Sequence, residues 1–269
     1  MTATTIRARP TTPVRPTTIV DTLKAEWTKL RTLRSTWLTL GGGMVASVVI
    51  AALVCVATVS QWDSLGEKQR AEFDPTSTAL LGVLFAAAIL GSLAVRAITS
   101  EYATGMIRVT FAAIPGRKGV LAAKAAILAV VVLPVALLTN VISYFLGRQI
   151  LSAKHIPMSL GDPGVVQAIL LGALAVSAVA VLGLALGAII RRTSGATTAL
   201  LLAVVGSQII GIALPEGARQ YLPGAALQAV VSVRHTAGVL APGRGLAVLV
   251  AYAAVALAIA ARLVAARDA

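Results

Sequence analysis

The chain has little charge, few aromatic residues and almost no cysteine, and each shortage excludes a class of protein. Of its 269 residues, 12% are charged and 4% are aromatic, whereas 58% are hydrophobic and the mean hydropathy is +0.89. Such a composition lies far from that of an ordinary soluble domain. The single cysteine, Cys55, excludes an intrachain disulfide framework.

The motifs of several enzyme classes are also missing. The sequence has no HExxH, GxSxG or CxxC pattern and no pair of carboxylates inside an apolar run. Its two histidines, His155 and His235, have no cysteine or acid cluster near them in the sequence. The GxxxxGK[ST] phosphate loop is absent, because PGRKG at Pro115–Gly119 lacks its spacing and its Ser or Thr. We therefore expect no catalytic residue, no metal site and no cofactor in this chain.

Long apolar runs are what the chain does contain. A run of about 20 apolar residues in a helix matches the thickness of a bilayer core. Both termini lie on the same side when the number of spans is even. The sequence predicts an all-α integral membrane protein whose six-span domain covers 37–264, with spans at 37–60, 78–95, 125–146, 165–190, 196–214 and 246–264.

The distribution of basic residues predicts the orientation. With the N-terminus inside, 16 of the 23 Lys and Arg fall on inner segments, and the first outer loop is acidic. The positive-inside rule then places both termini, including 265–269, in the cytoplasm. The net charge of +13 is explained by attraction to anionic membrane lipids rather than by nucleic acid, because no basic patch with interleaved aromatics occurs. We expect a multi-pass protein of a bacterial plasma membrane.

Two different segments precede the first span. Residues 1–18, rich in Thr, Pro and Arg, predict a disordered cytosolic tail. Residues 19–36 have apolar side chains at steps of three or four with cations between them, which predicts an amphipathic interface helix. That helix is either a plain membrane anchor or a surface that also meets a cytosolic partner. Its candidate interface residues are Trp27, Lys29, Arg31 and Arg34.

Polar residues within the spans are few. Asn140, Tyr144 and Gln208 are candidate pathway-lining residues, although such groups in membrane helices more often hydrogen-bond to neighbouring helices. No acid or base lies deep in a span, which disfavours an ion-coupled carrier. Between the last two spans, the apolar stretch 225–233 is too short to cross a membrane and predicts a short re-entrant or interfacial helix.

The most informative segment is Arg96–Lys124, between spans 2 and 3. It carries five Lys or Arg against one acid, Glu101. Ser100 could cap a short cytosolic helix that starts at Glu101, is weakened at Gly105 and ends before Pro115. A role only in setting the membrane orientation would explain the basic residues of this segment. It would not explain why the segment is so much longer than the turn RRTS between spans 4 and 5.

This segment resembles the loop between the second and third spans of ABC-2-type transporter permeases. The pattern E-Y/F-x-x-G-x-I-R, then P-x-R and a Lys, is carried here by Glu101, Tyr102, Gly105, Ile107, Arg108, Pro115, Arg117 and Lys124. The opening AEWTKLRTLRSTWLTL and the ending LAVLVAYAAVALAIAARLVAARDA are similar to those of actinobacterial members.

The resemblance implies a permease subunit whose loop holds a coupling helix, received by a separate ATP-binding protein that carries ATP and Mg²⁺. The implied coupling residues are Glu101, Tyr102, Gly105, Arg108, Pro115 and Arg117. It further implies a second permease copy, commonly a homodimer, and export as the direction of transport. The aliphatic spans favour a lipophilic or drug-like compound.

Three alternatives stay open from the sequence. A non-transporting scaffold or immunity protein would use the same loop for assembly. An intramembrane enzyme is disfavoured by the missing catalytic pairs. An ion-coupled carrier would need no ATPase partner.

Overall fold

The computed structural model describes residues 18–113, 116–234 and 238–266, and every regular element in these ranges is helical. The predicted tail up to residue 17, Pro115, His235 and the last three residues lie outside this described part. Five long helices run along the molecule: α2 (Arg34–Gln61), α5 (Val83–Ala103), α7 (Arg117–Leu151), α8 (Val165–Ile190) and α13 (Pro242–Ala266).

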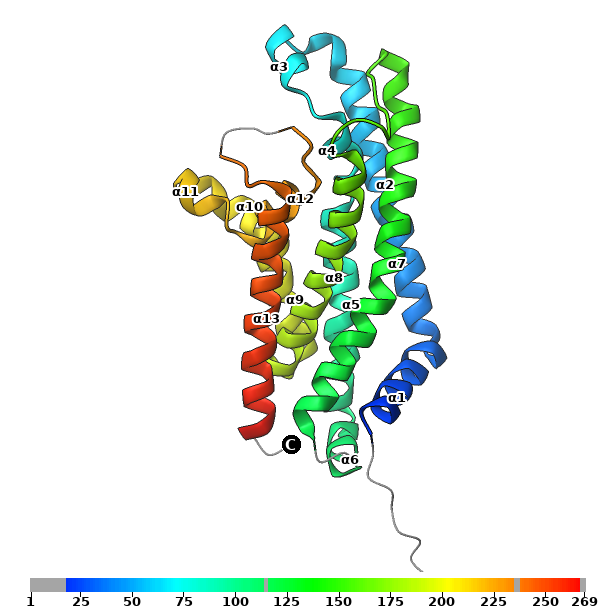
Figure 1. Cartoon of the computed structure of the whole chain (residues 1–269), viewed down its shortest axis with the longest axis vertical. Coiled ribbons are helices and arrows are strands. Elements are labelled where there is room, and N and C mark those ends of the chain that lie inside the picture. The colour runs from blue at the N-terminus through cyan, green and yellow to red at the C-terminus, as the bar shows by residue number, and fades with distance from the viewer. Residues whose placement is uncertain (1–17, 114–115, 235–237, 267–269) are drawn as a thin grey trace, which may run out of the picture.

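The shorter helices gather mainly at the two ends of this bundle (Figure 1). One end, which we call the α6 end, holds α1 (Ile19–Thr32), α6 (Met106–Ala113) and the end of α13. The opposite end, called the α12 end, holds α3 (Glu67–Glu72), α4 (Pro75–Ala79), α11 (Glu216–Arg219) and α12 (Pro223–Val231).

Six helical segments are long and apolar enough to cross a membrane, which confirms the predicted fold class. Their limits reach beyond most of the predicted apolar runs, because polar and charged turns extend the helices at the ends. The six segments are Arg34–Ser64, Pro75–Ala103, Arg117–Lys154, Val165–Ile190, Thr193–Ala213 and Pro242–Ala266.

The centre of the bundle is the pair α5 and α8, which are the two most buried spans. Glycines let these helices approach closely: a Cβ on Gly183 would collide with the carbonyl of Gly91. A Cβ on Gly187 would lie 2.7 Å from the Ile98 side chain and 3.1 Å from the Val95 carbonyl. The GxxxG spacing in α8 is therefore a packing surface for α5.

The fifth span is not one regular helix. It consists of α9 (Thr193–Leu201), a π-helical segment Leu202–Gly206, α10 (Ser207–Ile210) and a 3₁₀ turn. Helix α12 packs on this interruption, and the Gly224 amide donates a 2.9 Å hydrogen bond to the Ser207 hydroxyl. A Cβ on Gly224 would overlap the carbonyl of Val204, so only glycine permits this contact.

Helix α1 is shorter than the predicted 19–36. Thr18 caps it with its side chain, and the backbone becomes extended at Leu33. Residues 34–36 belong to α2, because the chain turns at Leu33 and starts a new helix. The buried face of α1 carries Glu26 and Leu30, while Trp27 points outward with 42% of its surface exposed. The face against the bundle is thus partly polar.

Candidate functional site

Helix α5 extends further than the sequence suggested. It continues through Ser100 and Glu101 to Ala103, so the predicted helix start at Glu101 is wrong. The break comes instead at Gly105, whose φ of +71° is a left-handed conformation that favours glycine. The segment between spans 2 and 3 is therefore the last turns of α5, a sharp bend and the short helix α6.

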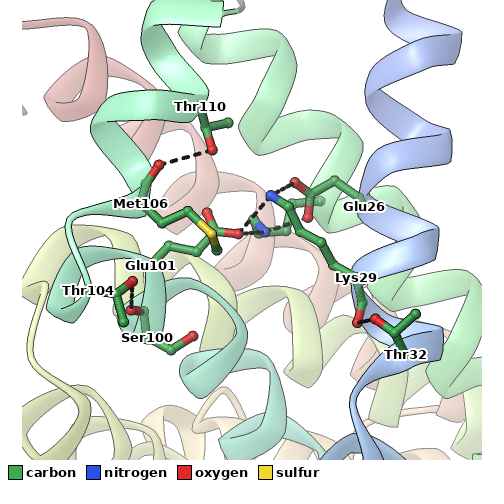
Figure 2. Close-up of polar contacts among 9 residues, drawn as sticks. Glu26, Lys29, Thr32, Ser100, Glu101, Thr104, Met106 and Thr110 are labelled. Atoms are coloured by element: carbon green, nitrogen blue, oxygen red, sulfur yellow. Dashed lines mark hydrogen bonds and ion pairs between the residues drawn. The ribbon is translucent and has the colours of Figure 1, made fainter.

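Four charged side chains meet where α1, α5 and α7 come together. The Oε1 atom of Glu101 accepts hydrogen bonds from Nζ of Lys29 at 3.0 Å and from Nζ of Lys124 at 2.9 Å. Glu26 completes the set, with Oε1 2.9 Å from Lys29 and Oε2 in a short ion pair with Lys124. Figure 2 shows Glu26 and Lys29 reaching from α1 toward Glu101. We call these four residues the ion-pair cluster.

Three members of the cluster are removed from solvent. The side chains of Glu26, Glu101 and Lys124 are each no more than 5% exposed, while that of Lys29 is 32% exposed. Two carboxylates and two ammonium groups make the cluster formally neutral. Burial of these charges is therefore tolerated only while all four groups remain paired. Removing one partner from a buried ion pair typically costs about 3–5 kcal/mol.

The environment of Lys29 acts on its protonation in two opposing ways. Burial alone would lower the pKa of Lys29, but hydrogen bonds to Glu26 and Glu101 and their negative charges outweigh it. The pKa of Lys29 therefore lies above its ordinary value. The ammonium form, which the cluster needs, is favoured at all ordinary pH values.

Glu101 bonds through only one of its oxygens. Both lysines donate to Oε1, whereas the buried Oε2 has no hydrogen-bond partner among the described residues. In Figure 2 the carboxylates of Glu26 and Glu101 lie on either side of the Lys29 ammonium group. Through this one oxygen, Glu101 joins α5 to both α1 and α7.

The other residues predicted for coupling lie in different surroundings. The Tyr102 ring is half-buried with the guanidinium carbon of Arg191 5.0 Å from its centroid, which joins α5 to the turn after α8. Arg117 lies 5.6 Å from the Phe111 ring and donates a 3.5 Å hydrogen bond to the Val264 carbonyl. Arg108 is exposed on α6. Pro115 falls outside the described residues, and a coupling role for all of them stays a prediction.

Helix α6 presents one buried and one exposed side. Ile107 is 3% exposed and turns inward. Met106 and Val109 are 44% and 69% exposed, Arg108 is also exposed, and Thr110 is half-buried. An apolar pair beside a cation, on a helix at the extremity of the bundle, is a surface suited to contact another protein.

The four candidate interface residues of the N-terminal region lie in two different environments. Lys29 belongs to the ion-pair cluster, whereas Trp27, Arg31 and Arg34 are exposed. The carbonyl of Arg31 accepts a 3.0 Å hydrogen bond from the indole of Trp37. Exposed Trp at both positions fits the headgroup level of a membrane.

The candidate pathway residues do not come together. Asn140 is 2% exposed and donates a 3.1 Å hydrogen bond to the Ile169 carbonyl, linking α7 to α8. Tyr144 is fully buried within the bundle. Gln208 lines a different place, a cavity of about 390 Å³ at the α12 end. Lining of a pathway by any of the three stays a prediction.

Glu26 is the member of the cluster that the sequence reasoning missed. Its signal was available, because an acid three positions before Lys29 on a helix can pair with it. The pattern of 19–36 predicted an amphipathic interface helix, and Glu26 was not assigned to any contact of that helix. Only the packing of α1 on α7 shows that this face is covered.

Six described helices long and apolar enough to cross a membrane, with a bent connection between α5 and α7 held by buried ion pairs, define a multi-pass membrane protein. The sequence profile described as ABC-2 family transporter protein matches residues 22–209, from α1 through the π-helical segment. The chain therefore belongs to the ABC-2 transporter family and is a permease, which confirms the resemblance. No match was found among curated proteins.

Proposed function

We propose that this permease is the membrane subunit of an exporter, driven by a separate ATP-binding protein that binds ATP and Mg²⁺. The observation that carries the proposal is the ion-pair cluster. It connects α1, the α5–α6 bend and α7 at the end of the bundle where α6 is exposed. A push on α6 would therefore be transmitted to three elements at once.

The physical basis is the cost of separating these charges. Moving α5 without α1 and α7 would take Glu101 away from both Lys29 and Lys124 and leave its buried carboxylate unpaired, at about 3–5 kcal/mol. Rigid motion of the three helices together avoids that cost. The cluster would thus convert a local contact on α6 into rocking of the spans, the type of motion in which packed elements move as units.

The orientation in this proposal places the α6 end in the cytoplasm, together with both termini. The excess of Lys and Arg in the inner segments supports it. The ATP-binding protein would then contact Arg108 and Val109 on α6, with the exposed side of α1 beside them. The α12 end would face outward, and α12 would be the re-entrant element near the exit.

A second copy of the permease would complete the pathway. The spans that start at Arg34, Thr193 and Pro242 are mostly exposed in the single chain, in contrast to α5 and α8. Their aliphatic surfaces can contact lipid or another protomer. A lipophilic or drug-like substrate fits these walls, because no described span carries a charge deep in the membrane.

The test co-expresses the full chain with a candidate ABC ATP-binding protein and purifies the complex in mild detergent. Arg108→Glu is expected to lower co-purification and substrate-stimulated ATP hydrolysis at least about tenfold, since a charge reversal at an exposed contact changes its electrostatic complementarity. Arg148→Glu, the same reversal on α7 at the α12 end, is the matched control.

The permease alone is expected to hydrolyse no ATP. Strong hydrolysis by the isolated chain would contradict the proposal. So would an equal effect of both reversals. Stable binding of the ATP-binding protein without ATP-dependent flux into or out of vesicles would favour a scaffold over an exporter.

A further inference from the structure

A second cavity, of about 420 Å³, lies at the α6 end between α1, the start of α2, α5 and α7. It adjoins the ion-pair cluster, which forms its inner wall. A volume of this size is in the range of small-ligand sites. Its walls differ chemically, and the difference indicates what kind of molecule fits.

The charged wall has a surplus of one positive charge. Lys29, Lys124 and Arg96 line the cavity together with Glu26 and Glu101. The two lysines are paired with the two carboxylates, so Arg96 is the unneutralised cation. It is exposed, and one hydrogen bond is described for it, from Nη2 to the Thr39 hydroxyl at 2.9 Å. The remaining guanidinium N–H groups can bind an oxyanion, for which a planar fork of donors is well suited.

The opposite wall is apolar. Leu30, Leu93 and Leu128 are all buried and line the cavity, with Ala97 and Ile127 beside them. Ser35 and Thr36, at the first turn of α2, also line the cavity. A ligand that uses the whole cavity must therefore carry an anionic group, hydrogen-bonding oxygens and an adjoining hydrocarbon part.

We propose that this cavity binds the headgroup of an anionic phospholipid, with its phosphate on Arg96 and the start of an acyl chain against Leu93 and Leu128. The cavity borders the apolar span of α2, and exposed Trp37 directly follows Thr36 in that helix. Tryptophan is enriched at the headgroup level of bilayers. The lipid would contact α1, α2 and α5 together. This inference does not depend on transport or on an ATP-binding partner.

Binding is measured by native mass spectrometry and by lipid titration of the purified full chain in detergent. The probes are dioleoyl phosphatidylglycerol, dioleoyl phosphatidylcholine with identical chains but no net charge, and inorganic phosphate. We expect one tightly retained phosphatidylglycerol, bound about tenfold or more tightly than phosphatidylcholine. Inorganic phosphate at the same concentration should not displace it, because a free ion gains nothing from the apolar wall.

Arg96→Gln should weaken phosphatidylglycerol binding about tenfold, because it removes the charge-assisted contact and leaves an uncharged polar side chain at an exposed position. Arg192→Gln, at the same end but outside the cavity, should leave binding unchanged. Ala97→Phe, which narrows the cavity at its apolar side and keeps every charge, should also weaken binding. Gel filtration and thermal unfolding would confirm that this variant is folded.

Three results would overturn the proposal. The first is equal binding of the two lipids, and the second is displacement by inorganic phosphate, which would make the site a free-anion site. The third is an equal loss in Arg96→Gln and Arg192→Gln, which would show general attraction of anionic lipid to a basic surface.

Discussion

The Nζ atom of Lys124 in α7 lies 2.9 Å from Oε1 of Glu101 in α5. Helix α6 lies between these two residues in the sequence. This contact closes the base of the α5–α6–α7 connection. Because α1 adds Glu26 and Lys29 to the same point, four separate positions of the chain depend on one another.

Lys124→Met should destabilise the protein by about 3–5 kcal/mol, because it leaves the buried carboxylates of Glu26 and Glu101 with only the partly exposed Lys29 as a partner. The measurement is thermal unfolding in detergent. Lys118→Met, an exposed position on the same helix, should change stability by less than about 0.5 kcal/mol. Combining Lys124→Met with Glu101→Gln should cost less than the sum of the two single changes. Additive losses would show that the two residues do not interact.

Gly105→Ala should destabilise the α5–α6 bend by about 1–2 kcal/mol, since the φ of +71° strains any residue with a Cβ. The effect is purely conformational, because a Cβ there would meet no atom within 4 Å. Gly119→Ala is the matched control: it also has free space but lies inside α7, so it should stabilise by about 0.5–1 kcal/mol. The same sign of change in both variants would contradict this account.

Asp74→Ala should lower the stability of the α12 end. Its Oδ1 accepts the amides of Thr76 and Ser77, and Oδ2 accepts those of Val233 and Arg234 at 2.8 and 3.0 Å. Losing a helix cap and two charge-assisted bonds should cost about 2–3 kcal/mol and speed amide hydrogen exchange at positions 233 and 234.

The control for Asp74 is Asp63→Ala, which removes an exposed ion pair with Lys154. Such pairs are worth about 0–1 kcal/mol. A loss at Asp63 as large as at Asp74 would show that general charge, and not the bridging of two loops, stabilises this end.

The contribution of Lys29 to folding stability should decrease at high pH. Its pKa is raised on folding above 10.5, so the stability it adds is fully present below pH 10.5 and is lost as the pH rises through the folded-state pKa. The difference in melting temperature between wild type and Lys29→Met should therefore be constant from about pH 8 to about pH 10 and shrink above that range. A difference that grew with alkalinity would contradict the raised pKa.

Val109→Asp should abolish co-purification of the ATP-binding protein without lowering thermal stability. Val109 is 69% exposed on α6, so an aspartate there stays solvated in the free permease but would be buried in the proposed contact. Leu160→Asp, exposed at the α12 end, should leave co-purification unchanged. Undiminished binding of Val109→Asp would remove α6 from the contact.

The sequence by itself determined the parts that rest on composition and local pattern. Six apolar runs of bilayer length are sufficient to predict six spans, because a hydrocarbon core admits few other structures. The order Glu101, Gly105, Arg108 within a polar interruption was sufficient to indicate the family. The start of α1 also rests on neighbouring residues alone, because Thr18 and Asp21 form a capping box there.

Only the tertiary structure decided which charges are buried. The sequence predicted Glu101 at the start of a cytosolic helix. In the structure Glu101 is part of α5 and lies buried between α1 and α7. Lys29 reads as one of several surface cations, but Glu26 and Glu101 hold it. Ion pairs between residues 23 to 98 positions apart depend on how helices pack, and helix packing has no local signature. The segment was therefore recognisable from the sequence, while the contacts that connect it to the bundle were not.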